Sequence, residues 1–158
     1  MATILLVEDE DQVRLLAESY LEEQGHQVLS AGTPEGALAI LQTKTGIDLL
    51  FTDLDLKGDI HAGINVADKA IKILPQLKVL YTTGRAITDG MKARFVTGSA
   101  VLEKPYTVDQ LRTGLSKHFE SILYCGPNNP KPSLSPRATL NGARHAAWRR
   151  GLVRLVWL

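Results

Sequence analysis

Residues 3–11 read Thr-Ile-Leu-Leu-Val-Glu-Asp-Glu-Asp, a short apolar run that ends abruptly in acidic side chains. A nearly continuous apolar run of this length is typical of a strand buried on both faces, as in a parallel sheet. After Gln12 the apolar residues change to helical spacing, and Gly25 marks the end of that helix. This stretch therefore predicts a strand followed by a helix, with acidic residues at the junction.

The same strand–helix unit recurs along the chain. Short apolar runs predict four further strands, at residues 27–30, 47–52, 77–81 and 100–102. The helices that follow are predicted to begin after Thr33, to cover residues 64–74 and 88–95, and to run from Thr107 to about residue 123. Five alternating units predict an α/β, doubly wound fold, in which helices cover both faces of a mostly parallel sheet.

Chemically active side chains stand at the ends of these predicted strands. They are Glu8 and Asp9 after the first strand, Asp53 after the third, Thr82 or Thr83 after the fourth, and Lys104 after the fifth. The carboxyl ends of parallel strands form the usual ligand site of such folds. Three close carboxylates repel one another unless a cation lies among them, and Mg²⁺ prefers oxygen ligands. A metal-bound carboxylate can attack phosphorus, and an ammonium and a hydroxyl can stabilise the transferring group.

Each of these features alone has a simpler interpretation. Acidic residues are common at helix N-termini, and an aspartate at a strand end is commonly a turn or cap residue. A Thr-Thr-Gly sequence is ordinarily a turn, and surface lysines mostly keep proteins soluble. Their joint appearance at successive strand ends favours one shared site.

As a set, four segments resemble the receiver domains of response regulators in two-component signalling. They are Ile-Leu-Leu-Val-Glu-Asp-Glu (4–10), Leu-Phe-Thr-Asp-Leu-Asp-Leu (50–56), Val-Leu-Tyr-Thr-Thr-Gly (79–84) and Leu-Glu-Lys-Pro-Tyr (102–106). The resemblance covers about residues 3–120 and implies a stand-alone receiver. It also implies the flavodoxin-like, CheY-like fold, a (βα)5 arrangement whose five-stranded parallel sheet has the order 2-1-3-4-5.

The resemblance implies a role for each matching acidic residue. Asp9 would be a direct ligand of Mg²⁺, for which Mn²⁺ can substitute, and Glu8 would act largely through water. Asp53 matches the phosphoacceptor. Asp55 matches the position whose backbone carbonyl completes the metal shell, so its side chain would be incidental.

The other matching residues would respond to phosphorylation. Thr82 matches the switch hydroxyl by its spacing to Lys104, and Thr83 is the alternative. Lys104 matches the lysine that pairs with Asp53 and then with the phosphate. Pro105 matches a proline that usually follows a cis peptide bond.

Two departures from the family pattern affect the expected switch and the site loop. The family often has Tyr or Phe three residues before the lysine, where this chain has Val101. Tyr81 could take over that ring's function, although the simpler interpretation is that Tyr81 belongs to the core. The loop at residues 57–63 is longer than usual, and His61 in it is expected to be a solvated residue rather than a ligand.

The implied function is self-catalysed transfer of a phosphoryl group to Asp53, with later hydrolysis. The donor would be a sensor histidine kinase, a histidine phosphotransfer protein or a small acyl phosphate. Phosphorylation would alter protein contacts, including a homodimer contact, on the face of the fourth helix, fifth strand and fifth helix, with Arg85, Lys92, Arg94 and Tyr106. A phosphorelay intermediate and a DNA-binding transcriptional regulator are the alternatives.

Charge divides the chain into a receiver and a tail. All 17 acidic residues lie before residue 121, whereas six of the 18 basic residues follow it. The predicted organisation is a receiver at 1–123, a linker rich in Pro, Gly, Ser and Asn at 124–137, and a basic, apolar, helix-compatible tail at 138–158. That tail is too short for an effector domain with its own core. The alternatives are a docking or dimerising helix and a tail with no specific role, and contact with nucleic acid or membrane is not expected. One cysteine, with no signal peptide or membrane span, predicts a cytoplasmic protein.

Overall fold

The computed structural model of the chain describes residues 1–123, and it describes the side chains of residues 1–116. The predicted linker and basic tail lie outside the described residues. Within residues 1–123, no helix combines the length and the apolar character needed to cross a membrane.

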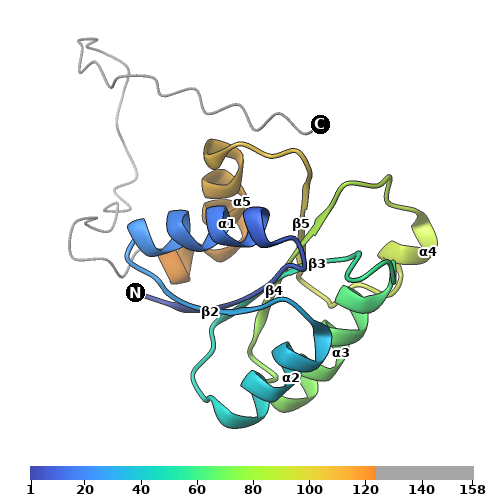
Figure 1. Cartoon of the computed structure of the whole chain (residues 1–158), viewed down its shortest axis with the longest axis horizontal. Coiled ribbons are helices and arrows are strands. Elements are labelled where there is room, and N and C mark those ends of the chain that lie inside the picture. The colour runs from blue at the N-terminus through green and yellow to red at the C-terminus, as the bar shows by residue number, and fades with distance from the viewer. Residues whose placement is uncertain (124–158) are drawn as a thin grey trace, which may run out of the picture.

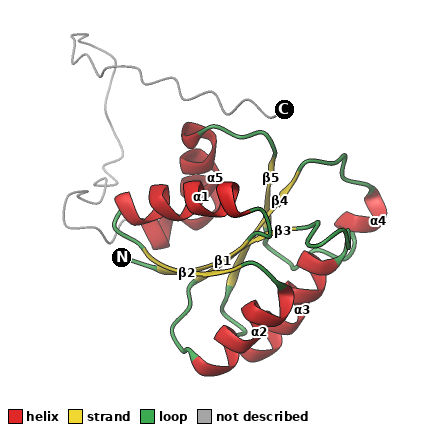
Figure 2. Cartoon of the chain, in the orientation of Figure 1, coloured by secondary structure: helices red, strands yellow, loops and turns green. Residues whose placement is uncertain are grey.

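Strands and helices alternate five times, as the sequence predicts (Figure 2). The strands are β1 (Thr3–Val7), β2 (Gln27–Ala31), β3 (Leu49–Asp53), β4 (Lys78–Thr83) and β5 (Ala100–Glu103). The helices are α1 (Asp11–Glu23), α2 (Pro34–Thr43), α3 (Ala62–Ile73), α4 (Asp89–Lys92) and α5 (Val108–Leu123).

The strands form one parallel sheet in the order β2-β1-β3-β4-β5, which confirms the predicted topology. Helices α1 and α5 cover one face, and α2, α3 and α4 lie on the other (Figure 1). The order reverses at β1, because the chain leaves β1 for β2 on one side and later adds β3 on the other. Such a reversal opens a crevice at the carboxyl ends of the central strands.

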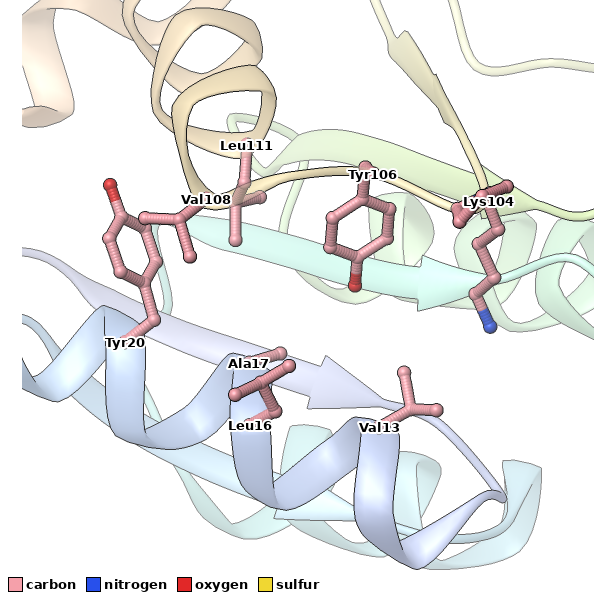
Figure 3. A pocket seen from close by; sticks show the side chains of 9 residues that line it. Val13, Leu16, Ala17, Tyr20, Lys104, Tyr106, Val108 and Leu111 are labelled. Atoms are coloured by element: carbon pink, nitrogen blue, oxygen red, sulfur yellow. The ribbon is translucent and has the colours of Figure 1, made fainter. Parts of the chain in front are cut away.

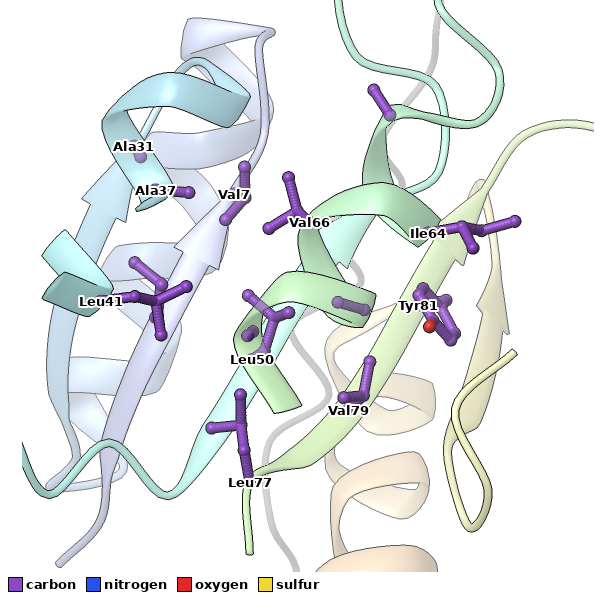
Figure 4. Close-up of a cluster of buried hydrophobic side chains, with 14 of the residues drawn as sticks. Val7, Ala31, Ala37, Leu41, Leu50, Ile64, Val66, Leu77, Val79 and Tyr81 are labelled. Atoms are coloured by element: carbon purple, nitrogen blue, oxygen red, sulfur yellow. The ribbon is translucent and has the colours of Figure 1, made fainter. Parts of the chain in front are cut away.

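Two apolar clusters hold the helices on the sheet, one on each face. Alternate residues of each strand point to opposite faces. In β4, Tyr81 therefore packs in the cluster under α2 and α3 (Figure 4), whereas Leu80 packs in the cluster under α1 and α5. All five residues of β3 are buried, so the strand that carries Asp53 lies at the centre of the protein.

The N-termini of α2 and α5 are capped as the sequence predicts. The hydroxyl of Thr33 accepts a hydrogen bond from the backbone N–H of Gly36 at 3.1 Å. Thr107 accepts from the N–H of Gln110 at 3.2 Å, while the Gln110 side chain accepts from the N–H of Thr107 at 2.7 Å. This reciprocal pair is a capping box, which fixes where α5 begins.

Several predicted elements have other bounds in the structure, and the differences at β4 and α4 are the ones that concern the site. Strand β4 continues through Thr83, because both threonines still pair with β5. The helix expected at residues 88–95 is only the single turn α4, which has no buried residue. Phe95 and Val96 leave the helix and pack against the sheet, and this packing competes with the helical continuation.

Candidate functional site

The ends of β1 and β3 bring three carboxylates together. Glu8 and Asp9 directly follow β1, and Asp53 is the last residue of β3. One oxygen from each of these carboxylates lies within 4.8 Å of the others. The predicted convergence of the two distant segments is therefore present in the structure.

Lys104 reaches this group from the end of β5. Its Nζ lies 2.6 Å from Glu8 Oε2 and 2.6 Å from Asp53 Oδ2. Burial alone would lower the pKa of Lys104, but its hydrogen bonds to Asp53 and Glu8 and their charges raise that pKa overall. Lys104 therefore remains an ammonium that neutralises part of the acidic cluster. The Lys104–Pro105 peptide bond is cis, as the resemblance implies.

Glu8 is a carboxylate whose surroundings disfavour its ionised form. Its side chain is almost fully buried, and this burial raises the pKa of Glu8 despite the hydrogen bond from Lys104. The neighbouring charge of Asp53 raises it further. The ionised form of Glu8 thus lowers the stability of the metal-free fold, as is common for groups that serve a site.

We expect Glu8→Gln to stabilise the metal-free protein near neutral pH, because the neutral amide avoids the cost of burying a carboxylate charge. A raised folded-state pKa makes folding most favourable below the unfolded-state pKa, and that stability is lost as the pH rises through the folded value. The gain should therefore disappear in acid, where Glu8 is protonated. Urea unfolding in EDTA measures this effect, and a variant less stable than the wild type near neutral pH would contradict the account.

The loop after β3 lies over the opposite side of the cluster. The backbone N–H of Lys57 donates to Asp9 Oδ2 at 2.9 Å, and the N–H of Asp55 donates to Asp53 Oδ1 at 3.1 Å. Lys57 has a φ of 56° and Gly58 a φ of 81°, so the loop turns sharply at these positions. These contacts hold the carboxylates beside an open cleft of about 660 Å³, which Asp9, Asp53, Asp55 and Lys104 line.

Gly63 is a positioning residue that sequence reasoning placed only at the end of the loop. A Cβ atom at Gly63 would lie 2.0 Å from the carbonyl oxygen of Asp53 and 2.9 Å from the Cα of Leu54. The backbone of α3 therefore packs directly on the end of β3. A glycine within the first turn of a helix that directly follows the site loop is the sequence signal for this close contact.

The two candidate hydroxyls occupy adjacent positions of β4. Thr82 pairs with Asp53 across the β3–β4 ladder, and Thr83 lies one residue further toward the cleft. The hydroxyl oxygen of Thr83 accepts a hydrogen bond from the N–H of Arg85 at 3.0 Å. Both threonines are buried.

Tyr81 is a core residue with one polar contact. Its ring stacks on Phe95 with 4.7 Å between the ring centroids, and its hydroxyl oxygen accepts from the N–H of Val96 at 3.4 Å. Burial raises the pKa of Tyr81 to about 12. Val101 packs against the same cluster. The core interpretation of Tyr81 therefore holds, and its hydroxyl also tethers the segment after α4.

The residues expected on the shared face of α4, β5 and α5 do not lie together. Arg85, Lys92 and Arg94 are exposed on the segment around α4. Tyr106 instead lies in an apolar groove between α1 and α5 (Figure 3), and its ring centroid is 6.4 Å from that of Phe51. His61 is half-buried before α3 rather than fully solvated, and it is not part of the carboxylate group.

Known proteins share this sequence pattern and fold. The family model described as response regulator receiver domain matches residues 4–116. The receiver protein CpdR of Brucella abortus is 30% identical over 118 residues, which cover 74% of this chain and 96% of CpdR. The sporulation initiation phosphotransferase F of Bacillus subtilis is 26% identical over 117 residues, with 92% of its length covered.

Other relatives are longer proteins. The alginate biosynthesis regulator AlgB of Pseudomonas aeruginosa is 32% identical over 118 residues, which cover 74% of this chain but 26% of AlgB. This chain thus spans about a quarter of the length of AlgB.

The solved structures agree with the sequence matches. A response regulator receiver protein from Sinorhizobium medicae superposes with a TM-score of 0.68 at 32% identity, covering 76% of this chain and 95% of that one. TrrA of Thermotoga maritima, solved in complex with Mg²⁺ and BeF, superposes with a TM-score of 0.64 at 25% identity, and the match covers 75% of this chain and 99% of TrrA. The chain belongs to the response regulator receiver domain family of two-component signalling.

Proposed function

We propose that the chain accepts a phosphoryl group on Asp53. The observation that supports this most strongly is the pairing of Asp53 with Lys104 inside a group of three carboxylates. A carboxylate whose second oxygen is held by an ammonium is oriented for attack on phosphorus, and the same ammonium can then bind the transferred oxygens.

The donor set fits Mg²⁺. Three carboxylates and one ammonium carry a surplus of negative charge, and all the donors are the oxygen atoms that Mg²⁺ prefers. Asp9, Asp53 and the backbone carbonyl of Asp55 would hold the ion, with Glu8 acting through water. When bound, Mg²⁺ supplies the positive charge that lets an anionic donor approach an anionic acceptor.

The chain's own residues then carry the transfer. An oxygen of Asp53 forms a bond to phosphorus as the donor's bond to phosphorus breaks, so the donor leaves as a free imidazole or carboxylate. Lys104 moves from the Asp53 carboxylate to the phosphoryl oxygens. In the later hydrolysis, water attacks phosphorus, inorganic phosphate leaves and the Asp53 carboxylate is restored.

Incubation with Mg²⁺ and acetyl phosphate, followed by intact mass measurement, tests this function. The wild type should gain one phosphoryl mass, which EDTA prevents, and Asp53→Asn should gain none. Asp48→Asn is the matched control, because Asp48 lies at the amino end of the sheet, where it accepts from the N–H of Thr3. No gain in the wild type, or an equal gain in Asp53→Asn, would refute the proposal.

For the switch hydroxyl, the contacts favour Thr82, which spacing to Lys104 also favours, over Thr83. Thr82 pairs with Asp53 in the β3–β4 ladder and shares its sheet face with Phe51 and Leu80, whereas Thr83 lies on the face of Tyr81. Movement of Thr82 toward a phosphoryl group on Asp53 would also shift the end of β4, where Thr83 accepts the hydrogen bond from the N–H of Arg85. Phosphorylation would thereby change the surface around α4.

Valine substitutions separate the two threonines. Thr82→Val should still be phosphorylated but should lose the phosphorylation-dependent amide shifts of residues 85–96 in NMR spectra. Thr83→Val, which removes the same hydroxyl from the opposite face, should keep those shifts. The reverse result would assign the switch to Thr83.

The donor would be a sensor histidine kinase or a histidine phosphotransfer protein. CpdR and phosphotransferase F, each matched over more than nine-tenths of its length, support a receiver role for the matched part of this chain, and the printed name of the second favours a phosphorelay as the alternative role. A homodimer contact at α4, β5 and α5 stays a prediction. DNA binding through the basic tail depends on residues 138–158, which lie outside the described residues.

A further inference from the structure

An ion pair crosses the mouth of the cleft. Arg85 Nη2, in the loop after β4, lies 2.7 Å from Asp55 Oδ2, in the loop after β3. Both residues line the cleft that contains Asp53 and Lys104. The Arg85 side chain is 63% exposed and that of Asp55 is 25% exposed, so the pair is accessible to solvent and to ligands.

The backbone of each partner is tied to the site. The N–H of Asp55 donates to Asp53 Oδ1, the second oxygen of the acceptor carboxylate. The N–H of Arg85 donates to the hydroxyl oxygen of Thr83. The guanidinium is therefore held at the mouth of the cleft, next to the loop that surrounds Asp53.

The two cations of the cleft are held with different strength. Lys104 is largely buried and forms ion pairs with two carboxylates, whereas Arg85 has one partner in an exposed pair. Exposed ion pairs contribute little free energy, so Arg85 can exchange its partner easily. A guanidinium also matches the geometry of phosphoryl oxygens, which it binds through two parallel hydrogen bonds.

We propose that Arg85 is the residue that captures small acyl phosphate donors at the mouth of the cleft, and that the Asp55 side chain restrains it. This inference rests on the proposed function. An incoming donor replaces Asp55 on the guanidinium and is then positioned for transfer to Asp53. The two partners of this ion pair therefore have opposite effects on the rate, which a merely structural ion pair would not produce.

The test compares second-order rate constants for phosphorylation by acetyl phosphate at low ionic strength. Arg85→Ala should lower the constant by about threefold to tenfold, because a steering cation is lost. Asp55→Asn, which keeps the backbone carbonyl, should raise it by about threefold. The double variant should match Arg85→Ala, since Asp55 acts through Arg85.

Arg112→Ala is the matched control. Arg112 is 64% exposed and pairs with Asp109 on α5, so the variant loses the same charge from an equally exposed arginine that does not line the cleft. Its rate constant should equal that of the wild type, and thermal unfolding should show that all variants are folded.

A second measurement needs no phosphorylation. In metal-free protein, the Arg85 Nε–Hε group should be more mobile in Asp55→Asn than in the wild type, as NMR relaxation measures. The inference is overturned if Arg85→Ala has the same rate constant as Arg112→Ala, or if Asp55→Asn raises the rate constant as much in the Arg85→Ala background as in the wild type. It is also overturned if the mobility of the Arg85 side chain is the same in the wild type and in Asp55→Asn. Failure of the wild type itself to be phosphorylated would overturn the proposed function, and the inference with it.

Discussion

Gly63→Ala should destabilise the protein by roughly 3 kcal/mol or more, and it should also slow phosphorylation of whatever protein folds. The added methyl would lie 2.0 Å from the carbonyl oxygen and 2.8 Å from the carbonyl carbon of Asp53. These are backbone atoms at the end of a buried central strand, so they cannot move aside as a flexible side chain can. Either α3 shifts away from the sheet or the end of β3 moves, and in both cases Asp53 is displaced.

Urea unfolding of Gly63→Ala and Gly114→Ala measures how tightly α3 packs on the end of β3. Gly114 lies within α5, and an added Cβ there meets no atom within 4 Å. Its substitution should be neutral or stabilising by up to about 1 kcal/mol, because alanine favours helix. Equal stability changes in the two variants would show that the contact between α3 and Asp53 is not tight.

Lys104→Met should destabilise the metal-free protein by about 3 kcal/mol near pH 8, because it leaves two buried carboxylates without their ammonium. Glu8 and Asp53 would then face each other with no compensating charge. Without the ammonium, the pKa of Glu8, which burial already raises, should rise further in the folded variant. Stability is then greatest in acid and is lost as the pH rises through that folded-state pKa.

Chemical denaturation in EDTA at about pH 5 and about pH 8 measures this pH dependence of the free energy of unfolding. The loss should be larger at the higher pH, and excess Mg²⁺ should restore more stability to Lys104→Met than to the wild type. Lys78→Met is the control, because Lys78 is exposed at the amino end of β4. A penalty that does not depend on pH would mean that Lys104 acts through packing alone.

The strand–helix alternation was sufficient to predict the convergence of Glu8, Asp9, Asp53 and Lys104, whereas the sheet order came from the resemblance to receiver domains. These residues lie at strand ends, and strand ends of a parallel sheet meet by topology alone. The cap residues Thr33 and Thr107 were also predictable, since a cap depends on a few neighbouring residues.

Other features depend on contacts between distant segments. The shortness of α4 follows from the packing of Phe95 on Tyr81, and the role of Gly63 follows from how closely α3 approaches β3. The ion pair of Arg85 with Asp55 joins two loops whose lengths and turns set its geometry. Neither hydrophobic periodicity nor residue spacing encodes close contacts between distant segments, so these features could be found only in the structure.

Chemical identification of the phosphorylated side chain tests the central claim most directly. Borohydride reduces an acyl phosphate to an alcohol, so treatment after acetyl phosphate and Mg²⁺ should convert the phosphorylated aspartate to homoserine. Peptide mass mapping should find homoserine at residue 53 and an unchanged Asp9 and Asp55. Homoserine at another position, or a phosphoryl group on a residue other than an acid, would contradict the account.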